Sequence, residues 1–217
     1  MLWRLGGVLE RDIAKNSKSK SRKAGNRLFV NLKIGNWGKW EACVKMKYTH
    51  HYESPLGGIT LASDGTDLIG LWFDGQKYFG ALLSEESVPK ELPVFWRTRE
   101  WLDIYFSGKA PGFLPALSMK TTPFRKAVWE IMLTIPFGQT MSYKEIAKRM
   151  AQQKGFPKTS ARAVGNAVGH NAVSLIIPCH RVVGANGSLT GYAGGLDKKV
   201  KLLTMEKADM SAFSMPS

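Results

Sequence analysis

The sequence contains few cysteines, fewer acidic than basic residues, and no long hydrophobic run. Only Cys43 and Cys179 occur in 217 residues, too few for a disulfide framework or a four-cysteine zinc site. We therefore expect a reducing, intracellular compartment, the cytoplasm. No stretch of about 18 apolar residues occurs, so we expect no membrane span. The apolar residues 1–9 are too few for a signal-peptide core, and acidic residues follow at once.

The excess of positive charge is uneven along the chain. Residues 1–45 hold 11 Lys/Arg and 3 Asp/Glu, a net +8, and the remaining 172 residues hold 20 and 14, a net +6. A basic globular body suits a polyanion such as DNA. A basic tail on an ordinary globular protein explains the charge equally well.

The first 45 residues differ in texture from the rest. Residues 14–27 are polar, basic and without periodicity, which predicts disorder, and residues 28–45 show no clearly capped element. Met46 opens a different pattern and is a plausible start of the functional protein. We interpret residues 1–45 as a basic, disordered extension, an ordinary tail in preference to a DNA-binding arm.

Residues 46–115 have the pattern of a small sheet with a helix. Three strands are predicted over 48–53, 59–63 and 68–73, separated by Gly-containing turns. Pro93 then begins a helix to about residue 106, with apolar residues at helical spacing. A Pro/Gly-bearing connection follows, and it predicts a domain boundary near residue 115. We expect this N-terminal domain to serve as support, and we assign it no catalytic residue.

Residues 116–217 are predicted to be mostly helical. One helix begins at Pro123, and Ser142 with Glu145 forms a capping box before a second helix over 143–151. A third over 160–169 completes a helix-turn-helix. We further expect a hairpin-like wing at 184–188 and a closing helix over 197–207. The overall class is α+β: an antiparallel-sheet domain plus a winged helix-turn-helix domain.

Cys179 follows the apolar residues 175–178 and directly precedes His180. A cysteine in such a position is either a small core residue or a nucleophile, whose reactive form is the thiolate. A helix-turn-helix before a Cys-His pair fits a protein that binds DNA in order to present a thiol to it.

The segment 178–183 (PCHRVV) resembles the active-site motif of the O6-alkylguanine-DNA alkyltransferases, also called methylated-DNA–protein-cysteine methyltransferases, of the bacterial type. The similarity covers residues 46–207. Further motifs in the family's order are 138–143 (GQTMSY), 161–167 (ARAVGNA), Asn171, 191–196 (GYAGGL) and 201–206 (KLLTME). The resemblance implies a ribonuclease H-like fold for the N-terminal domain and direct-reversal DNA repair. It also implies no cofactor and a monomer acting on double-stranded DNA that bears O6-alkylguanine.

The resemblance assigns the chemistry to four residues. Cys179 would take the alkyl group by in-line displacement, and His180, polarised by Glu206, would draw off the thiol proton through a water. Tyr143 would line the pocket and donate to the departing base. Because a thioether is a poor leaving group, each molecule would act once.

The resemblance also assigns residues to DNA binding and nucleotide flipping. Arg162 would fill the gap in the base stack from the minor groove, and Asn171 would tie the recognition helix to the cysteine segment. Tyr192 would stack on the base, with the carbonyl of Val182 accepting from its amine. The DNA- and base-binding set is Ser142, Ala161, Arg162, Asn171, Val182, Tyr192 and Ala193.

Some positions depart from the family pattern. Ala193 stands where some members have a serine, and Ala172 and Ser174 stand where some have prolines near the pocket rim. We hypothesise a roomier mouth that accepts larger alkyl groups or O4-alkylthymine. Some members bind zinc through N-terminal Cys and His, but Cys179 is the only cysteine after Met46. We therefore expect no metal, with His50 and His51 on a strand surface.

Three other functions fit parts of the pattern. A lesion-binding protein of this fold would lack the nucleophile, whereas Cys179 is present. A regulator that senses methylation of its own cysteine would carry an additional metal-binding cysteine cluster, which this sequence lacks. A thiol hydrolase of unrelated fold would leave the helix-turn-helix without a purpose.

Overall fold

The computed structural model describes residues 21–24, 27–33, 39–81, 83 and 87–214, which divide between two compact units, 1–46 and 47–217. The strands are β1 (Ser21–Ala24), β2 (Arg27–Lys33), β3 (Lys39–Lys45), β4 (Lys47–Ser54), β5 (Gly57–Ser63), β6 (Leu68–Phe73), β7 (Ser87–Pro89), β8 (Met141–Ser142) and β9 (Val182–Val183). The α-helices are α2 (Pro93–Phe106), α3 (Pro123–Met132), α4 (Tyr143–Gln153), α5 (Ala161–Gly169) and α6 (Leu196–Met205). Short 3₁₀ turns are η1 (Cys179–Arg181), η2 (Ala185–Gly187) and η3 (Met210–Ala212).

The first unit contains an antiparallel sheet in the order β1-β2-β3. The prediction of disorder and of no regular element is therefore wrong for the strand residues of 21–45, and residues 1–20 lie outside the described residues. The missed signal is the two-residue alternation of Leu28, Val30 and Leu32 with other side chains, which is typical of a strand. The predicted limits of the domains, at residues 45 and 115, stay predictions.

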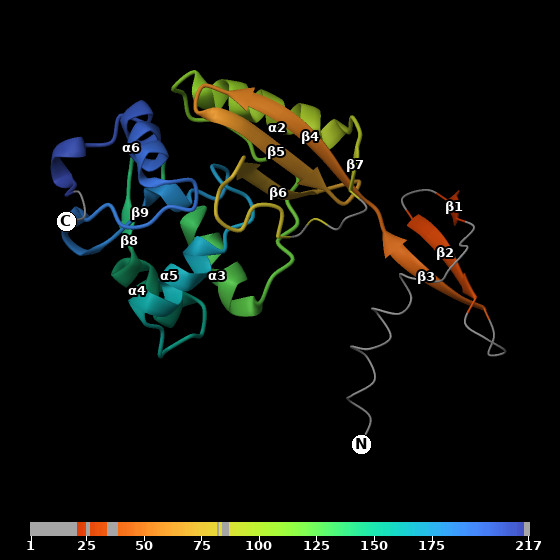
Figure 1. Ribbon diagram of the computed structural model, residues 1–217. Helices are drawn as coiled ribbons and strands as arrows, with labels where there is room; N and C mark the ends of the chain where they lie inside the picture. Colours follow the sequence, from red (N-terminus) through yellow and green to blue (C-terminus); the bar gives the residue numbers. More distant parts are fainter. Residues whose placement is uncertain (1–20, 25–26, 34–38, 82, 84–86, 215–217) are drawn as a thin grey trace. The chain divides into compact units, whose positions relative to one another are not determined.

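The second unit begins with a mixed sheet in the order β6-β5-β4-β7 (Figure 1). The three predicted antiparallel strands are confirmed, and β7, a short parallel edge strand, was not predicted. Every residue of β6 is buried, and α2 packs against β4 and β5. Gly70 allows the Trp72 ring to lie across β6, because a Cβ at Gly70 would come within 1.9 Å of that ring.

The helices α3, α4 and α5 pack against one another as the predicted helical domain (Figure 1). Each begins at a side-chain cap, from Thr122, Ser142 and Ser160, and the predicted capping box between Ser142 and Glu145 is complete. The Trp129 indole joins α3 to α5 by donating to the Ala167 carbonyl at 2.9 Å. Within the described ranges, no helix is both long and apolar enough to cross a lipid bilayer.

The region after the cysteine differs from the predicted wing. The segment β9 pairs in parallel with β8 instead of starting a hairpin, and residues 185–187 form the turn η2, closed by Gly184 N–H donating to the Ser188 carbonyl. Leu189 N–H donates to the Ser214 carbonyl, so the residue after the turn is bonded to the C-terminal segment. The closing helix α6 is confirmed, with bounds one or two residues earlier.

The capping box of α4 gives a stability prediction. Replacing Ser142 with alanine removes the acceptor for the Glu145 N–H at 3.1 Å, and we expect a loss of about 1 kcal/mol of unfolding free energy. Urea denaturation should show a lower midpoint with an unchanged slope. Ser142→Asp keeps an acceptor and should stay near wild type; equal midpoints for Ser142→Ala and wild type would contradict the role of the cap.

Candidate active site

Cys179 is held by the segment that returns from α5. The backbone turns sharply at Leu175, a buried residue with φ +68°, a conformation that costs a non-glycine residue about 1–3 kcal/mol. Asn171 joins the two ends of this turn: its amide donates to the Ile177 carbonyl at 2.7 Å and to Cys179 Sγ at 3.2 Å. The thiol is 5% exposed. The segment therefore presents a buried sulfur at a fixed position relative to the recognition helix.

His180 points away from solvent toward Glu206. Its Nε2 lies 2.6 Å from Glu206 Oε1, and because a carboxylate only accepts, Nε2 carries the hydrogen. Nδ1 is then the basic nitrogen. Nδ1 is buried and has no hydrogen-bond partner among the residues that the structure describes. The imidazole is therefore oriented as a base with one lone pair available.

Glu206 accepts from four groups. Besides His180, the Tyr105 hydroxyl donates to Oε1 at 2.7 Å, and Arg181 donates through Nε at 2.8 Å and Nη2 at 3.0 Å. The Gly138 N–H donates to Oε2 at 3.0 Å. Gly138 has φ +74°, and a Cβ there would lie 2.6 Å from the Glu206 carbonyl oxygen. Only glycine can therefore bring its backbone this close to Glu206.

These contacts set the charges of the pair. Burial alone would raise the pKa of Glu206, but the hydrogen bonds and charges of His180 and Arg181 together hold it well below its usual range. Glu206 therefore contributes stability that is present above pH about 4.5 and is lost as the pH falls. Burial lowers the pKa of His180 despite Glu206, so the imidazole is neutral at pH 7 and can accept a proton.

The resting thiol is neutral. Burial raises the pKa of Cys179, although hydrogen bonds from Asn171 and the charge of Lys199 oppose this. Lys199 is fully buried on α6 and donates to the carbonyls of Val182 and Thr190 at 2.6 and 2.8 Å. Burial lowers its pKa to about 8. At pH 7 a buried ammonium thus lies close enough to stabilise a thiolate once the proton leaves.

A pocket of about 380 Å³ lies between α4, α5 and the loop before α6, and Cys179 is not among the residues that line it. Tyr143 at the start of α4 lines it, as do Tyr192 and Ala193 from the loop before α6. The Tyr192 hydroxyl is buried without a partner within the described structure, and burial raises its pKa well above the usual value. Buried polar atoms without partners are uncommon and often mark a place that a ligand completes.

The helix-turn-helix residues lie as the sequence predicted. Ala161 and Arg162 are exposed at the start of α5, and Ser142 caps α4. Val182 is buried in β9, and its carbonyl already accepts from Lys199. Its expected bond to a guanine amine would have to use the second lone pair of that oxygen.

Three residues at the site were not predicted. Tyr105 comes from α2, in a domain given only a supporting role, while Arg181 and Lys199 stand beside the predicted residues. Lys199 had a readable signal: it shares one helical face with Leu202, Leu203 and Glu206, all buried. Tyr105 shows no local signal, since it lies 101 residues before Glu206.

Two rim residues are placed differently from the expectation. Ala172 and Ser174 are buried, and their backbones bond to Leu71 of β6 at 2.8 Å each. Ser174 also contacts the buried Gln76, so neither residue widens the mouth. Because these two smaller residues motivated the hypothesis of a roomier mouth, the structure gives that hypothesis no support; Ala193 affects only which hydrogen-bond donor is present.

The expected absence of a metal site stays a prediction. His51 lies half-exposed on β4 beside Glu53, and His50 lies 3.1 Å from Glu91. No group of three or more His, Cys, Asp or Glu side chains that could hold a metal ion occurs in the described part of the chain.

Comparisons with known proteins cover both domains of the second unit. Residues 47–113 match the family model described as 6-O-methylguanine DNA methyltransferase, ribonuclease-like domain. Residues 123–208 match the model of the DNA binding domain of the same proteins. The two matches together span most of the second unit.

Relatives over nearly their full length agree. A methylated-DNA–protein-cysteine methyltransferase of Mycobacterium bovis is 42% identical over 170 residues, which is 75% of this chain and 98% of the relative. One from Haemophilus influenzae is 38% identical, covering 74% of this chain and 86% of the relative. The crystal structure of Mycobacterium tuberculosis OGT in complex with DNA has a TM-score of 0.63 at 40% identity, covering 77% of this chain and 94% of that one. The chain therefore belongs to the 6-O-methylguanine-DNA methyltransferase family.

Proposed function

We propose that this protein repairs DNA by direct reversal, transferring an alkyl group irreversibly from O6 of guanine in double-stranded DNA to Cys179. We propose O4-alkylthymine as a second substrate. The observation that supports this most strongly is the buried thiol with a neutral His180, held by the ionised Glu206, together with a pocket lined by Tyr143 of the helix-turn-helix and by Tyr192. The family membership makes DNA the macromolecule that this pocket serves.

The chemical step balances without a cofactor. The thiol proton passes to His180 Nδ1, and the sulfur attacks the alkyl carbon as the bond from that carbon to O6 breaks. Guanine leaves with its carbonyl restored and takes up a proton, for which the Tyr143 hydroxyl is the proposed donor. Tyr143 is then reprotonated through solvent as His180 releases the thiol proton, so guanine gains the one proton that the thiol loses. Lys199 stabilises the transient thiolate by its charge.

The product explains why the reaction stops after one turnover. Cys179 becomes a thioether, whose sulfur is neither a good leaving group nor a nucleophile of comparable strength. Regeneration would need a second nucleophile next to the sulfur. The side chains that hydrogen-bond the sulfur are Asn171 and Ser174. An amide is not a nucleophile, and the Ser174 hydroxyl donates to the Gln76 amide oxygen, which is not a base that could activate it.

DNA binding follows from the placement of α5. A base inside a duplex cannot reach a buried thiol, so the nucleotide must rotate out of the stack. We propose that Arg162 fills the vacated space from the minor groove, where the small neighbour Ala161 permits close approach. Tyr192 stacks on the base, with Ala193 beside it. We propose a monomer that acts in the cytoplasm.

The stoichiometry can be tested by intact-protein mass. Incubation with a duplex carrying O6-methylguanine should add about 14 Da, one methylene, and saturate at one per chain, because Cys179 is consumed. Cys179→Ala should gain nothing and still bind the duplex. Binding of the alkylated duplex by wild type without any gain in mass would instead indicate a lesion-binding protein.

Tyr105 should shift the pH dependence of transfer. In wild type the rate should hold down to below pH about 6.5, because the pKa of His180 lies under that ordinary value. Tyr105→Phe removes a donor from Glu206 and leaves its charge more available to His180. The acid limb of the rate profile should therefore move to higher pH, with a loss of about 1.5–3 kcal/mol of stability.

Tyr52→Phe is the matched control for Tyr105. In the wild type the Tyr52 hydroxyl donates at 2.7 Å to the carboxylate of Asp103, which lies on α2 like Tyr105, but this bond is exposed. It should leave the pH profile unchanged and cost no more than about 1 kcal/mol. Equal profiles for Tyr105→Phe and Tyr52→Phe would show that Tyr105 serves stability alone.

Arg162 should matter only when the base must leave a duplex. Arg162→Ala should slow transfer from alkylated duplex by at least about tenfold, since unstacking costs a few kcal/mol. It should leave transfer from the free base O6-benzylguanine unchanged. Equal slowing with both substrates would place Arg162 in folding or in the pocket.

A further inference from the structure

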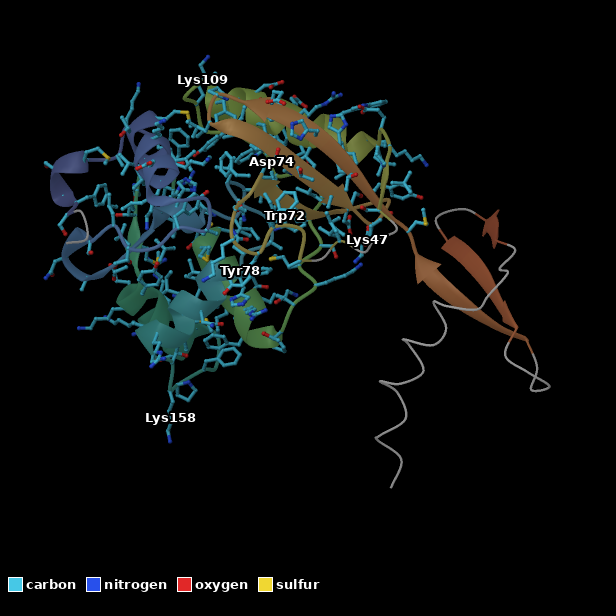
Figure 2. The ribbon with its side chains drawn as sticks, in the orientation of Figure 1. Lys47, Trp72, Asp74, Tyr78, Lys109 and Lys158 are labelled. Atoms are coloured by element: carbon cyan, nitrogen blue, oxygen red, sulfur yellow. The ribbon has the colours of Figure 1, made fainter. Side chains whose placement is uncertain are left out.

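The loop that follows β6 forms part of the pocket mouth. Residues 74–81, called here the β6 loop, bring Lys77 and Tyr78 to the pocket, opposite Tyr143 of α4. Figure 2 shows Asp74 at the sheet and Tyr78 beside the helices. A nucleotide that enters the pocket therefore passes this loop as well as the helix-turn-helix.

The loop is anchored to the active-site segments. Gln76 is buried, and its side-chain oxygen accepts from Phe73 N–H at 3.0 Å and from the Ser174 hydroxyl at 3.2 Å. Lys77 N–H donates to the Ala193 carbonyl at 3.0 Å. These bonds fix the loop to both the cysteine segment and the pocket wall, so its outward side chains keep a defined position relative to the base.

Tyr78 is held in a strained conformation and is partly exposed. Its φ is +62°, which disfavours any residue with a Cβ, and its ring stacks on His170 at 4.3 Å, directly after α5. The side chain is nevertheless 42% exposed, as is its neighbour Phe79. Backbone strain that surrounding contacts maintain, at an exposed aromatic residue, is typical of binding surfaces.

The groups that remain available favour a phosphate. His170 covers one face of the Tyr78 ring, so the hydroxyl is the group of Tyr78 that can donate to a ligand. Lys77 Nζ lies 5.2 Å from the centre of the same ring. The carboxylate of Asp74 is bonded instead to the Thr60 hydroxyl at 2.8 Å, on the sheet. A hydroxyl and an ammonium close together, at the mouth of a base pocket, match the groups that contact DNA backbone.

We propose that the β6 loop is a second DNA-binding element, in which Lys77 and Tyr78 contact the backbone of the alkylated strand at the flipped nucleotide. This inference rests on the proposed function, because it needs a nucleotide in the pocket. The N-terminal domain then takes part in binding as well as support. The helix-turn-helix and the β6 loop would grip the same strand from two sides of the pocket.

The test separates backbone contacts from pocket contacts. Binding to an alkylated duplex is measured at several salt concentrations in the Cys179→Ala background, with and without Lys77→Ala. Losing one phosphate contact should weaken binding several-fold and reduce the slope of log affinity against log salt by about 0.9. Lys90→Ala is the matched control: it removes an equal charge from an exposed lysine beside Tyr48 on the sheet, and should leave the slope unchanged.

The aromatic residue is tested by transfer rates in the active protein. Tyr78→Phe and Tyr78→Ala should both slow transfer from alkylated duplex, the alanine variant more, because it also loses the stack on His170. Tyr78→Phe keeps the ring that lines the pocket, so it should react with free O6-benzylguanine, which has no phosphate, at the wild-type rate. That result also shows that the pocket is folded.

Two results would overturn the inference. Equal salt slopes for Lys77→Ala and Lys90→Ala would exclude a phosphate contact by Lys77. Equal slowing with duplex and free base would make Tyr78 a wall of the pocket only. Failure of the proposed function gives a different result: wild type would transfer from neither substrate. The salt dependence of DNA binding by Lys77→Ala and Lys90→Ala could still be compared, because it needs no transfer.

Discussion

The buried carboxylate of Glu206 is the interaction on which the rest of the site depends. A buried charge is tolerated only when its oxygens are fully bonded, and here the donors come from α2, from the link after α3, and from the cysteine segment. With Glu206 itself at the end of α6, one carboxylate thus joins four parts of the chain around His180. Any change that removes a donor alters both the fold and the proton affinity of His180.

Burial also keeps the Cys179 thiol unreactive before the substrate binds. Cys179 is protonated at rest because burial raises its pKa, and a neutral thiol reacts slowly with small electrophiles. The groups that favour the thiolate, Lys199 and Asn171, are already in place. The sulfur therefore becomes reactive only when its proton is removed while the alkyl carbon lies in line with it.

Local patterns predicted most of the fold and the core of the site. The capping box at Ser142 and the prolines at the start of α2 and α3 are local patterns, and the structure confirms these helix starts. The motif around Cys179 is equally local, and its roles stay predictions. Tyr105 could not be found in this way, because its contact with Glu206 joins distant segments. The partner of Leu189 could not be found for a related reason: its N–H donates to Ser214 near the C-terminus, and no local signal indicates that contact.

The two-residue pairing of β8 with β9 has a consequence for how this protein can change over evolutionary time. Met141 pairs with Val182 and Ser142 with Val183 through main-chain atoms, so the start of α4 is registered to the cysteine segment without side chains. Exposed residues of α4 and α5, apart from those proposed to enter the groove, can then change without moving the sulfur. Recognition of the DNA around the lesion and transfer of the alkyl group can therefore change independently in this architecture.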